Sequence, residues 1–179
     1  FYLAPHSNAS TDVSREGTVR GVIASYYPGS ANGKRAAGIF VRNLKDVYPL
    51  PDKVYASATT ALGEVRQPYM PSVLLELGYH DNTADALWVE NNLEAIAANL
   101  VLSLTEYFGL PFVVPLTPWR GTVRTQGSPL HLRAAPALNS AVVTTIPSGA
   151  PVTVYGRYQD WYTVGYNGLL GYAFADYIT

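Results

Sequence analysis

Glu76 is the residue of this 179-residue chain whose setting most clearly indicates chemistry. It interrupts an apolar run over residues 72–79, and a carboxylate in such a run is costly to bury unless it is paired, protonated or close to a metal. Burial raises the pKa of a carboxyl group toward the range that a general base needs. The competing interpretation is a solvent-facing glutamate on an edge strand, or one paired with an arginine. We take Glu76 as a candidate general base.

The three histidines are the next candidates. His6 stands at the end of an opening strand, where an imidazole can serve as a metal ligand or proton carrier, although the residue pattern alone favours a surface histidine at a turn. His80 has the spacing from Glu76 of a second ligand, and is otherwise a loop residue or a neighbour of the substrate. His131 falls in a predicted strand and is expected to be structural. His6 is therefore the histidine that we expect to act with Glu76.

The elements that would position Glu76 and His6 alternate between strands and helices. The run over 72–79 suits a strand buried on both faces. Apolar residues at helical spacing predict the helices, and Gly109 is a natural stop for the last of them. Such alternation predicts an α/β fold with a mixed or parallel sheet. The expected strands are 19–27 and 72–79, and the expected helices are 31–48, 84–89 and 93–108.

The rest of the chain has no helical period. Short alternating strands are separated by turn residues, and Asn167-Gly168 is a strong signal for a two-residue hairpin. About sixty residues of this kind predict a small all-β barrel. The expected strands are 130–133, 142–146, 152–157, 161–166 and 169–173.

A boundary between these two parts is expected near residue 110. Residues 1–110 carry a net charge of −3 and residues 111–179 a net charge of +2. Three prolines, Pro111, Pro115 and Pro118, favour a stiff extended connector. The sequence therefore predicts domains over 1–110 and 120–179, joined by a linker over 111–119.

Composition excludes several classes of function. A net charge of −1 argues against an electrostatically driven nucleic-acid partner, and no apolar run is long enough for membrane insertion. The absence of cysteine excludes disulfides and cysteine nucleophiles. Neither a phosphate-binding glycine loop nor a Gly-x-Ser-x-Gly elbow occurs. Because the chain opens at Phe1 within a predicted strand, we expect a processed product or a fragment.

Around His6 and Glu76 the first part resembles the zinc-dependent N-acetylmuramoyl-L-alanine amidases of bacterial cell walls. The family segment Ser-x-His-x-Asn-Ala corresponds to residues 4–9, APHSNA, and the strand Gly-Val-x-x-Tyr-Tyr to residues 21–27, GVIASYY. A helix with Lys-Arg near its start follows, here residues 33–35. The segment Pro-x-Val-Leu-x-Glu-x-Gly-Phe/Tyr corresponds to residues 71–79, PSVLLELGY, with Asn82 after it. The resemblance implies the C-terminal part of a three-layer α/β amidase domain.

Residues 120–179 resemble a bacterial SH3-like cell-wall-targeting domain. The matching segments occur in order, although Ala135 replaces the usual glycine before Pro136. They are LHLRAAP at 130–136, IPSG at 146–149, VTV at 152–154, WYTV at 161–164 and YNGLLGY at 166–172. Aromatic side chains often form recognition surfaces, so Trp161, Tyr162, Tyr166 and Tyr172 are the expected wall contacts, with barrel core as the alternative for at least half of them.

Together the two resemblances imply a secreted autolysin or endolysin at the bacterial cell wall. It would hydrolyse the amide between N-acetylmuramic acid and L-alanine in peptidoglycan, with His6 as a zinc ligand, Glu76 as general base, and Asn8 and His80 near the substrate. The family takes two earlier ligands, from a Gly-His-Gly segment and a glutamate, which this chain does not show; they would belong to an N-terminal half of the domain. The alternatives are a non-catalytic peptidoglycan-binding protein and a zinc peptidase that cuts the stem peptides.

Overall fold

The chain folds into two compact units, Phe1–Leu110 and Pro111–Thr179. The structure is a computed structural model that describes residues 1–10 and 15–179. In the described residues, no helix combines the length and the apolar character needed to cross a membrane.

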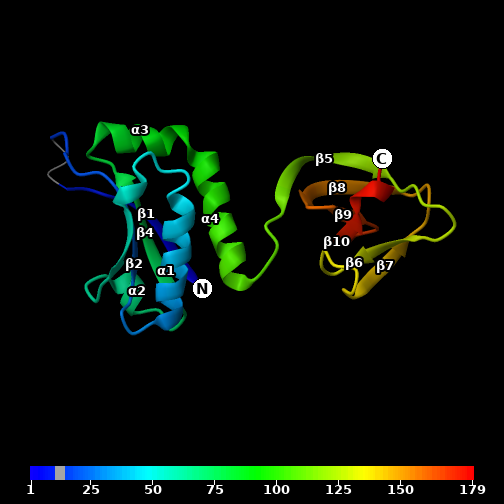
Figure 1. The fold of residues 1–179 in the computed structure, drawn as a ribbon, viewed down its shortest axis with the longest axis horizontal. Helices are drawn as coiled ribbons and strands as arrows, with labels where there is room; N and C mark the ends of the chain where they lie inside the picture. Colours follow the sequence, from blue (N-terminus) through cyan, green and yellow to red (C-terminus); the bar gives the residue numbers. More distant parts are fainter. Residues whose placement is uncertain (11–14) are drawn as a thin grey trace. The chain divides into compact units, whose positions relative to one another are not determined.

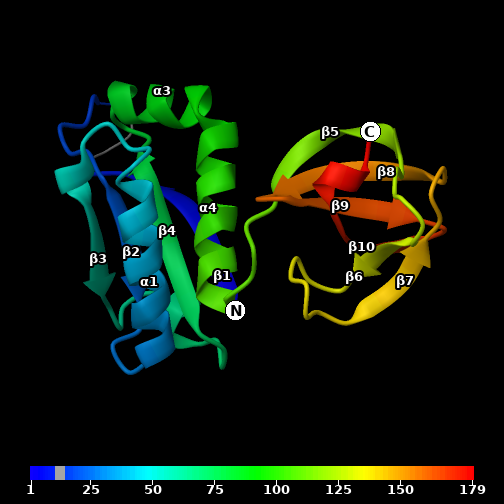
Figure 2. The same ribbon diagram turned by 45° about the vertical axis from the view of Figure 1, so that its right-hand side comes forward.

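A four-stranded mixed sheet organises the first unit, in the order β1-β4-β2-β3 (Figure 2). Strand β4 runs parallel to β1 and antiparallel to β2, and β3 runs parallel to β2. The predicted α/β class with a mixed sheet is thus confirmed. The strands are β1 (Tyr2–Asn8), β2 (Val22–Tyr26), β3 (Val54–Ala58) and β4 (Ser72–Tyr79).

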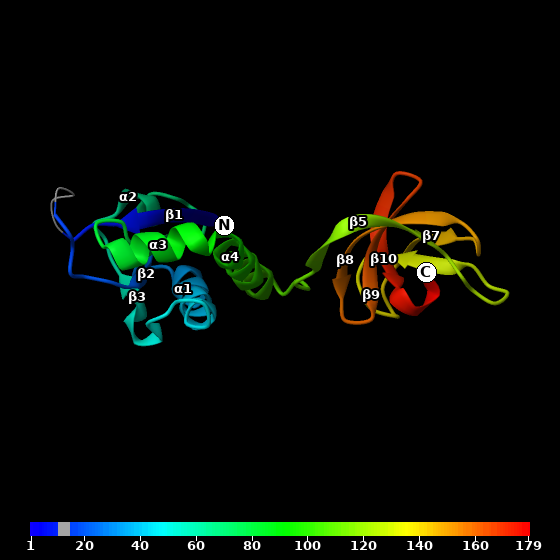
Figure 3. The ribbon, with the colours of Figure 1, turned by 90° about the horizontal axis from the view of Figure 1, so that it is seen from above.

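Helices cover the two faces of this sheet unequally. Three helices pack on one face and enclose the main core, which includes Phe40, Leu75 and Trp88. A short helix packs on the opposite face, where Val65 joins a small cluster with Ala4 and Leu74 (Figure 3). The large face is covered by α1 (Ala31–Leu44), α3 (Thr83–Asn91) and α4 (Leu93–Phe108), the small face by α2 (Gly63–Arg66), and a 3-10 turn, η1 (Pro51–Lys53), precedes β3.

Helix ends follow local chemistry. The Ser30 hydroxyl accepts a hydrogen bond from the backbone N–H of Gly33 and so caps the start of α1. Gly109 ends α4 in a left-handed conformation, with φ of 68°, which confirms the predicted stop. The helix predicted over 31–48 ends earlier, at Leu44, and continues as turns.

Strand β4 is buried on both faces, as its apolar run predicts. Val73, Leu75 and Leu77 belong to the main core under the three helices. Leu74 lies on the other face against α2, and Glu76 follows it two residues later on that same face because side chains alternate along a strand. Glu76 therefore lies on the face of the sheet that only the short helix α2 covers among the described helices.

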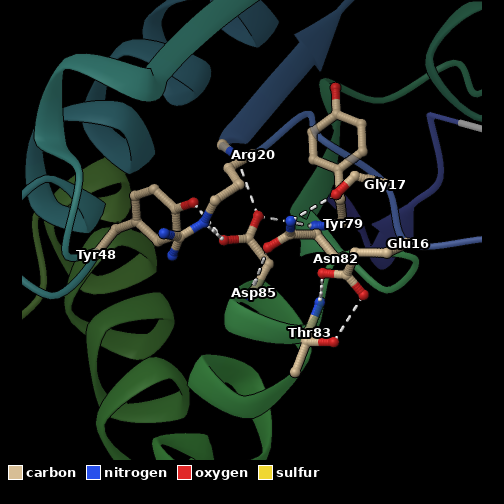
Figure 4. Close-up of polar contacts among 9 residues, drawn as sticks. Glu16, Gly17, Arg20, Tyr48, Tyr79, Asn82, Thr83 and Asp85 are labelled. Atoms are coloured by element: carbon tan, nitrogen blue, oxygen red, sulfur yellow. Dashed lines mark hydrogen bonds and ion pairs between the residues drawn. The ribbon is translucent and has the colours of Figure 1, made fainter.

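A buried carboxylate, Asp85 on α3, fastens the end of β4 to its surroundings. Its side chain is fully buried and accepts four hydrogen bonds (Figure 4). The donors are the Nε of Arg20 at 2.8 Å, the hydroxyl of Tyr48 at 2.6 Å, and the backbone N–H groups of Gly21 and Tyr79 at 3.1 Å each. One carboxylate thus joins the residues before β2, the loop after α1 and the last residue of β4.

Hydrogen bonds around Asn82 extend this network to the segment before β2. The amide nitrogen of Asn82 donates to the Gly17 carbonyl at 2.7 Å, while its oxygen caps α3 by accepting from the Asp85 N–H (Figure 4). The Glu16 carboxylate accepts from both the backbone N–H and the hydroxyl of Thr83. The start of α3 is therefore held from two sides.

Gly78 is required by the same network. Its φ of +86° lies in the region that favours glycine, and a Cβ atom at this position would stand 3.2 Å from the Cβ of Asp85. Glycine at this position allows the Asp85 side chain to approach the backbone of β4 closely.

The second unit is a six-stranded antiparallel sheet that curves around one core, in the order β5-β8-β9-β10-β6-β7 (Figure 1). This confirms the predicted small SH3-like all-β fold. Asn167 and Gly168 have φ of 49° and 78°, as the hairpin signal predicts. The elements are β5 (Val114–Thr122), β6 (Leu130–Arg133), β7 (Val142–Ile146), β8 (Pro151–Tyr158), β9 (Trp161–Tyr166), β10 (Leu169–Phe174) and η2 (Ala175–Tyr177).

Most of the segment predicted as a linker lies in strand β5. This strand pairs with β8 from Val114, and it stands at the edge of the sheet. Proline is tolerated on an edge strand because the missing N–H can face away from the neighbour, which explains Pro115 and Pro118. The extended backbone that these prolines favour is thus built into the sheet.

We expect residues 111–179 to fold on their own. Their core is formed entirely within this segment, and the last residues close it through paired hydrogen bonds between Thr122 and Thr179. Urea unfolding of the isolated segment should show one cooperative transition followed by both circular dichroism and tryptophan fluorescence. Non-coincident or absent transitions would contradict an independent unit.

We expect Asp85→Asn to destabilise the first unit by about 3 kcal/mol at neutral pH, because the amide leaves Arg20 without its anionic partner. Burial opposes ionisation of Asp85, but hydrogen bonds from Tyr48, Arg20 and two backbone N–H groups outweigh it and lower the pKa. The stabilisation is present above the unfolded-state pKa of about 3.9 and is lost as the pH falls through the lower folded-state value.

Urea unfolding as a function of pH measures this contribution. The difference in the free energy of unfolding between wild type and Asp85→Asn should shrink below about pH 4. Asp46→Asn, at an exposed position just after α1, is the matched control and should change stability by less than about 0.5 kcal/mol. A pH-independent difference would argue against an ionised Asp85.

Candidate functional site

Glu76 lies in the middle of the first sheet. Strand β4 stands between β1 and β2, with His6 beside Glu76 on one neighbour and Ile23 opposite it on the other. The edge-strand interpretation is therefore wrong, and among the described residues no arginine pairs with this carboxylate. Its Oε2 atom is buried and has no hydrogen-bond partner in the described part of the chain. The side chain is a partly buried carboxyl group that faces α2.

Burial raises the pKa of Glu76, and the negative charge of Glu64 raises it further. Positive charge on His6 or His80 acts in the opposite direction but does not cancel the effect. Among the described residues no donor bonds to Oε2 of Glu76. The Glu76 anion therefore lacks the stabilisation by hydrogen bonds that the Asp85 anion receives. Glu76 therefore binds a proton more tightly than an exposed glutamate does, which is the property that a general base or acid needs.

His6 is partly exposed beside this carboxyl group. Its Nε2 atom lies 3.1 Å from Oε1 of Glu64 on α2. Helix α2 is placed there by Val65, which packs on Ala4 and Leu74 from β1 and β4. The structure thus brings together His6, Glu76 and Glu64 on one face of the sheet.

Asn8 and His80 lie at the ends of β1 and β4, next to this group. The His80 N–H donates to the Asn8 carbonyl at 2.8 Å, and His80 Nδ1 lies 3.0 Å from the Ser7 hydroxyl. A shift in register between His6 and Asn8 interrupts the pairing of the two strands. Both predicted substrate neighbours therefore stand at the rim beyond Glu76, and His80 contacts Ser7.

The described residues do not form a complete metal site. No group of three or more His, Asp or Glu side chains in residues 1–10 and 15–179 is arranged to hold a metal ion. A catalytic zinc takes about three protein ligands and keeps a fourth position open. His6 supplies one imidazole, and its Nε2 lies against Glu64. The donor set shown here therefore does not fit zinc without further ligands.

The four aromatic residues expected as wall contacts lie at different places in the second unit. Tyr162 packs on the barrel core and makes an edge-to-face contact with Trp119. Tyr172 is half-buried in β10. Trp161 lines one groove but is mostly buried, with 6% of its surface exposed, whereas Tyr166 is half-buried and lines a second groove.

The two grooves differ in the charge of their walls. One, of about 670 Å³, is lined by residues that include Arg124, Arg133, Trp161, Phe174 and Tyr177, and is called the arginine groove below. The other, of about 480 Å³, has only uncharged side chains and is called the tyrosine groove. The tyrosine groove is lined by Thr153, Tyr155, Thr163, Gly165, Tyr166, Asn167, Gly168, Leu169 and Leu170.

Sequence reasoning missed several of these residues. Glu64 gave no signal because α2 has four residues, too few for a helical period. Arg124 lies in a loop, where neither the alternation of apolar and polar residues nor a motif spacing marks it as functional. His131, expected to be structural, is exposed, contacts Arg133 and lines the arginine groove.

Two family models match the chain. Residues 2–106 match N-acetylmuramoyl-L-alanine amidase, and residues 128–179 match the bacterial SH3 domain. A comparison with curated proteins found no match.

Solved amidase structures share the fold of the first unit. The CwlD amidase from Clostridioides difficile, solved with the GerS lipoprotein, is 20% identical with a TM-score of 0.53 over 60% of this chain. An N-acetylmuramoyl-L-alanine amidase from Clostridium difficile 630 is 17% identical, and Ami1 from Mycobacterium smegmatis 16% identical, each with a TM-score of 0.50 over 60% of this chain. The alignments cover 53%, 56% and 53% of those chains, respectively, so this chain spans about half of their length.

The amidase match covers more than half of the chain and contains both His6 and Glu76. The matched residues form the mixed sheet with its covering helices, and the SH3 match falls within the separate β unit. This chain therefore belongs to the N-acetylmuramoyl-L-alanine amidase family, and carries a bacterial SH3 domain after its amidase part.

Proposed function

We propose that this chain is the C-terminal part of a peptidoglycan hydrolase that cleaves the amide between N-acetylmuramic acid and L-alanine. Family membership supports the reaction class. The observation that carries the proposal is Glu76, a partly buried carboxyl group with a raised pKa beside His6. Buried polar atoms in folded proteins are usually hydrogen-bonded, and Oε2 of Glu76 has no such bond within the described residues. A role in chemistry accounts for this exception better than a purely structural role does.

In this proposal Glu76 moves the proton of the reaction. Its carboxylate takes a proton from the attacking water and returns it to the nitrogen of the leaving L-alanine. The raised pKa brings the group closer to the working pH, so that both steps are accessible to the same side chain. In this proposal Asn8 and His80 contact the substrate, and their position at the ends of β1 and β4 beyond Glu76 supports that role.

We propose zinc as the cofactor, with His6 as one ligand. When bound, zinc would polarise the amide carbonyl. Since the described residues do not supply a complete set of ligands, the proposal requires further ligands, from another segment of the same amidase domain.

The second unit would hold the enzyme on its polymer, which implies an extracellular location at the bacterial cell wall. Its match to the bacterial SH3 domain and its two exposed grooves support this role. Weak contacts to a repeating polymer raise the local concentration of the catalytic unit.

A non-catalytic peptidoglycan-binding protein is the second candidate. The observation in its favour is the incomplete donor set around His6 in the described residues. The two candidates differ in one product, because only an amidase releases new L-alanine amino termini from peptidoglycan.

We expect His6→Ala and Glu76→Gln to fail differently in the longest natural form of the protein. Removing a ligand should reduce bound zinc and activity together. Glu76→Gln keeps the size of the side chain but cannot accept a proton, so zinc should remain bound while turnover falls by about 10²–10⁴-fold. Bound zinc is measured by elemental analysis and turnover by the release of L-alanine amino termini.

Glu94→Gln, an exposed glutamate at the start of α4, is the matched control and should change neither quantity. Normal turnover in Glu76→Gln would rule out the general-base assignment. Tight stoichiometric zinc in the 179-residue chain alone would show that its own residues complete the site, contrary to our proposal. Absence of any L-alanine release from the wild type would favour the non-catalytic candidate.

We expect the 179-residue chain to sediment with purified peptidoglycan in the presence of a metal chelator. The proposed wall contacts are made by aromatic and arginine side chains of the second unit, and none of them needs a metal. Residues 1–110 alone, as the matched control, should remain largely in the supernatant. Equal sedimentation of the two would place wall binding in the first unit instead.

A further inference from the structure

The arginine groove combines a rigid apolar floor with charged walls. Trp161 and Phe174 face each other across paired strands β9 and β10 and make an edge-to-face contact with 5.3 Å between ring centroids. Tyr177, in the 3-10 turn η2, extends this surface and is 45% exposed. Leu138, from the loop after β6, is 74% exposed and adds an aliphatic edge. A ligand with small apolar groups can pack on such a floor.

Two guanidinium groups stand on the walls. The backbone N–H of Arg124 donates to the Tyr177 carbonyl, which fixes the loop that carries this arginine beside η2. Arg133 is oriented by bonds from its Nη atoms, one to the Ser140 carbonyl at 2.8 Å and one with His131 Nδ1 at 3.1 Å. The backbone of Arg124 and the side chain of Arg133 are thus each held at the groove by hydrogen bonds within the second unit.

The charged side chains of this groove form no ion pairs with the described residues. In the described part of the chain neither Arg124 nor Arg133 forms an ion pair. Asp176 also lines the groove and forms none. Two positive groups and one negative group are therefore available to a ligand that carries carboxylates and an ammonium group.

The tyrosine groove provides the contrast. None of its lining residues is charged. Neutral sugars are suited to a surface of aromatic rings, hydroxyls and amides, whereas guanidinium groups are suited to carboxylates, to which they can donate two parallel hydrogen bonds. The arginine groove is therefore suited to a charged ligand and the tyrosine groove to a neutral one.

We propose that the arginine groove binds the peptide stems of peptidoglycan through their carboxylates, rather than the sugar strands. This inference rests on the proposed function, which supplies peptidoglycan as the polymer. Arg124 and Arg133 bind carboxylates of the stem, Asp176 accepts a hydrogen bond from an ammonium group, and alanine methyl groups pack on Leu138, Phe174 and Tyr177, beneath which Trp161 is largely buried. The groove thereby selects peptide over glycan.

Such binding is weak at each site and sensitive to salt. Arg124 is exposed, and ion pairs at exposed positions contribute little because water and salt screen them. A polymer that repeats the same stem compensates for weak single contacts by rebinding. A single peptide should therefore be tested by a method that detects weak complexes.

The test is an NMR titration of the full 179-residue chain with three probes. They are the pentapeptide L-Ala–γ-D-Glu–L-Lys–D-Ala–D-Ala, the same peptide with its carboxyl groups amidated, and chitotetraose as the sugar strand. We expect the free pentapeptide to shift resonances of Trp161 and Arg124 and to leave those of Tyr155 and Asn167 in the tyrosine groove unchanged. The amidated peptide and chitotetraose should not shift the arginine-groove resonances.

Two arginine variants localise the contact. Arg124→Gln should raise the dissociation constant of the pentapeptide about fivefold, because one charged contact at an exposed position is lost. Arg120→Gln removes the same charge from an exposed position outside the groove and should leave the constant unchanged. Leu138→Gln, which removes an exposed apolar contact without touching the core, should also weaken binding.

Each contrary result overturns the inference. These results are equal binding of the amidated peptide, chitotetraose shifts in the arginine groove, pentapeptide shifts in the tyrosine groove, or an unchanged constant in Arg124→Gln. Sedimentation with whole peptidoglycan separates this inference from the proposed function. Sedimentation of the chain without any pentapeptide binding overturns the inference and leaves the proposed function standing, whereas a chain that does neither contradicts both.

Discussion

The first unit depends on how one buried charge is satisfied. Asp85 is removed from water, and its carboxylate is stable there only because Arg20, Tyr48 and two backbone N–H groups donate to it. These donors come from segments far apart in the sequence, so satisfying the charge fixes the end of β4 relative to the start of β2. Gly78 is part of the same constraint, since a side chain there would crowd Asp85.

Glu76 shows the opposite outcome of the same physics nine residues earlier. Asp85 is fully and Glu76 partly withdrawn from water, but donors surround Asp85 and lower its pKa, whereas Oε2 of Glu76 has no partner among residues 1–10 and 15–179 and its pKa is raised. The two environments thus shift the pKa values of the two carboxyl groups in opposite directions. Asp85 is kept as a structural anion, whereas Glu76 can exchange a proton. The parallel pairing of β1 with β4 sets Glu76 beside His6, and the Asp85 network holds the end of the same strand at Tyr79.

Much of this arrangement could be predicted from local patterns. The buried strand with its single carboxylate, the long helix ending at Gly109 and the Asn167-Gly168 hairpin depend on neighbours in the sequence, and all three are present. Asp85 could not be recognised, because its partners Arg20 and Tyr48 come from distant segments. Strand β5 was missed because its prolines argue against an inner strand, and only the sheet order shows that it is an edge. Pairing and sheet order are non-local, which is why the sequence alone did not determine them.

The two units place different demands on their charged groups. In the reaction proposed for the first, Glu76 needs few donors and partial burial so that its proton affinity remains high, and tight substrate binding is not required of it. In the binding role proposed for the second, Arg124 is exposed and Arg133 is half-buried, so the contact that Arg124 would make with a carboxylate is weak and reversible. On a polymer with many equivalent stems, weak reversible contacts hold the chain near its substrate and still permit movement from one bond to the next. A tightly bound module would confine the catalytic unit to the few bonds within reach, so the exposed position of Arg124 supports the proposed hydrolysis of an extended polymer.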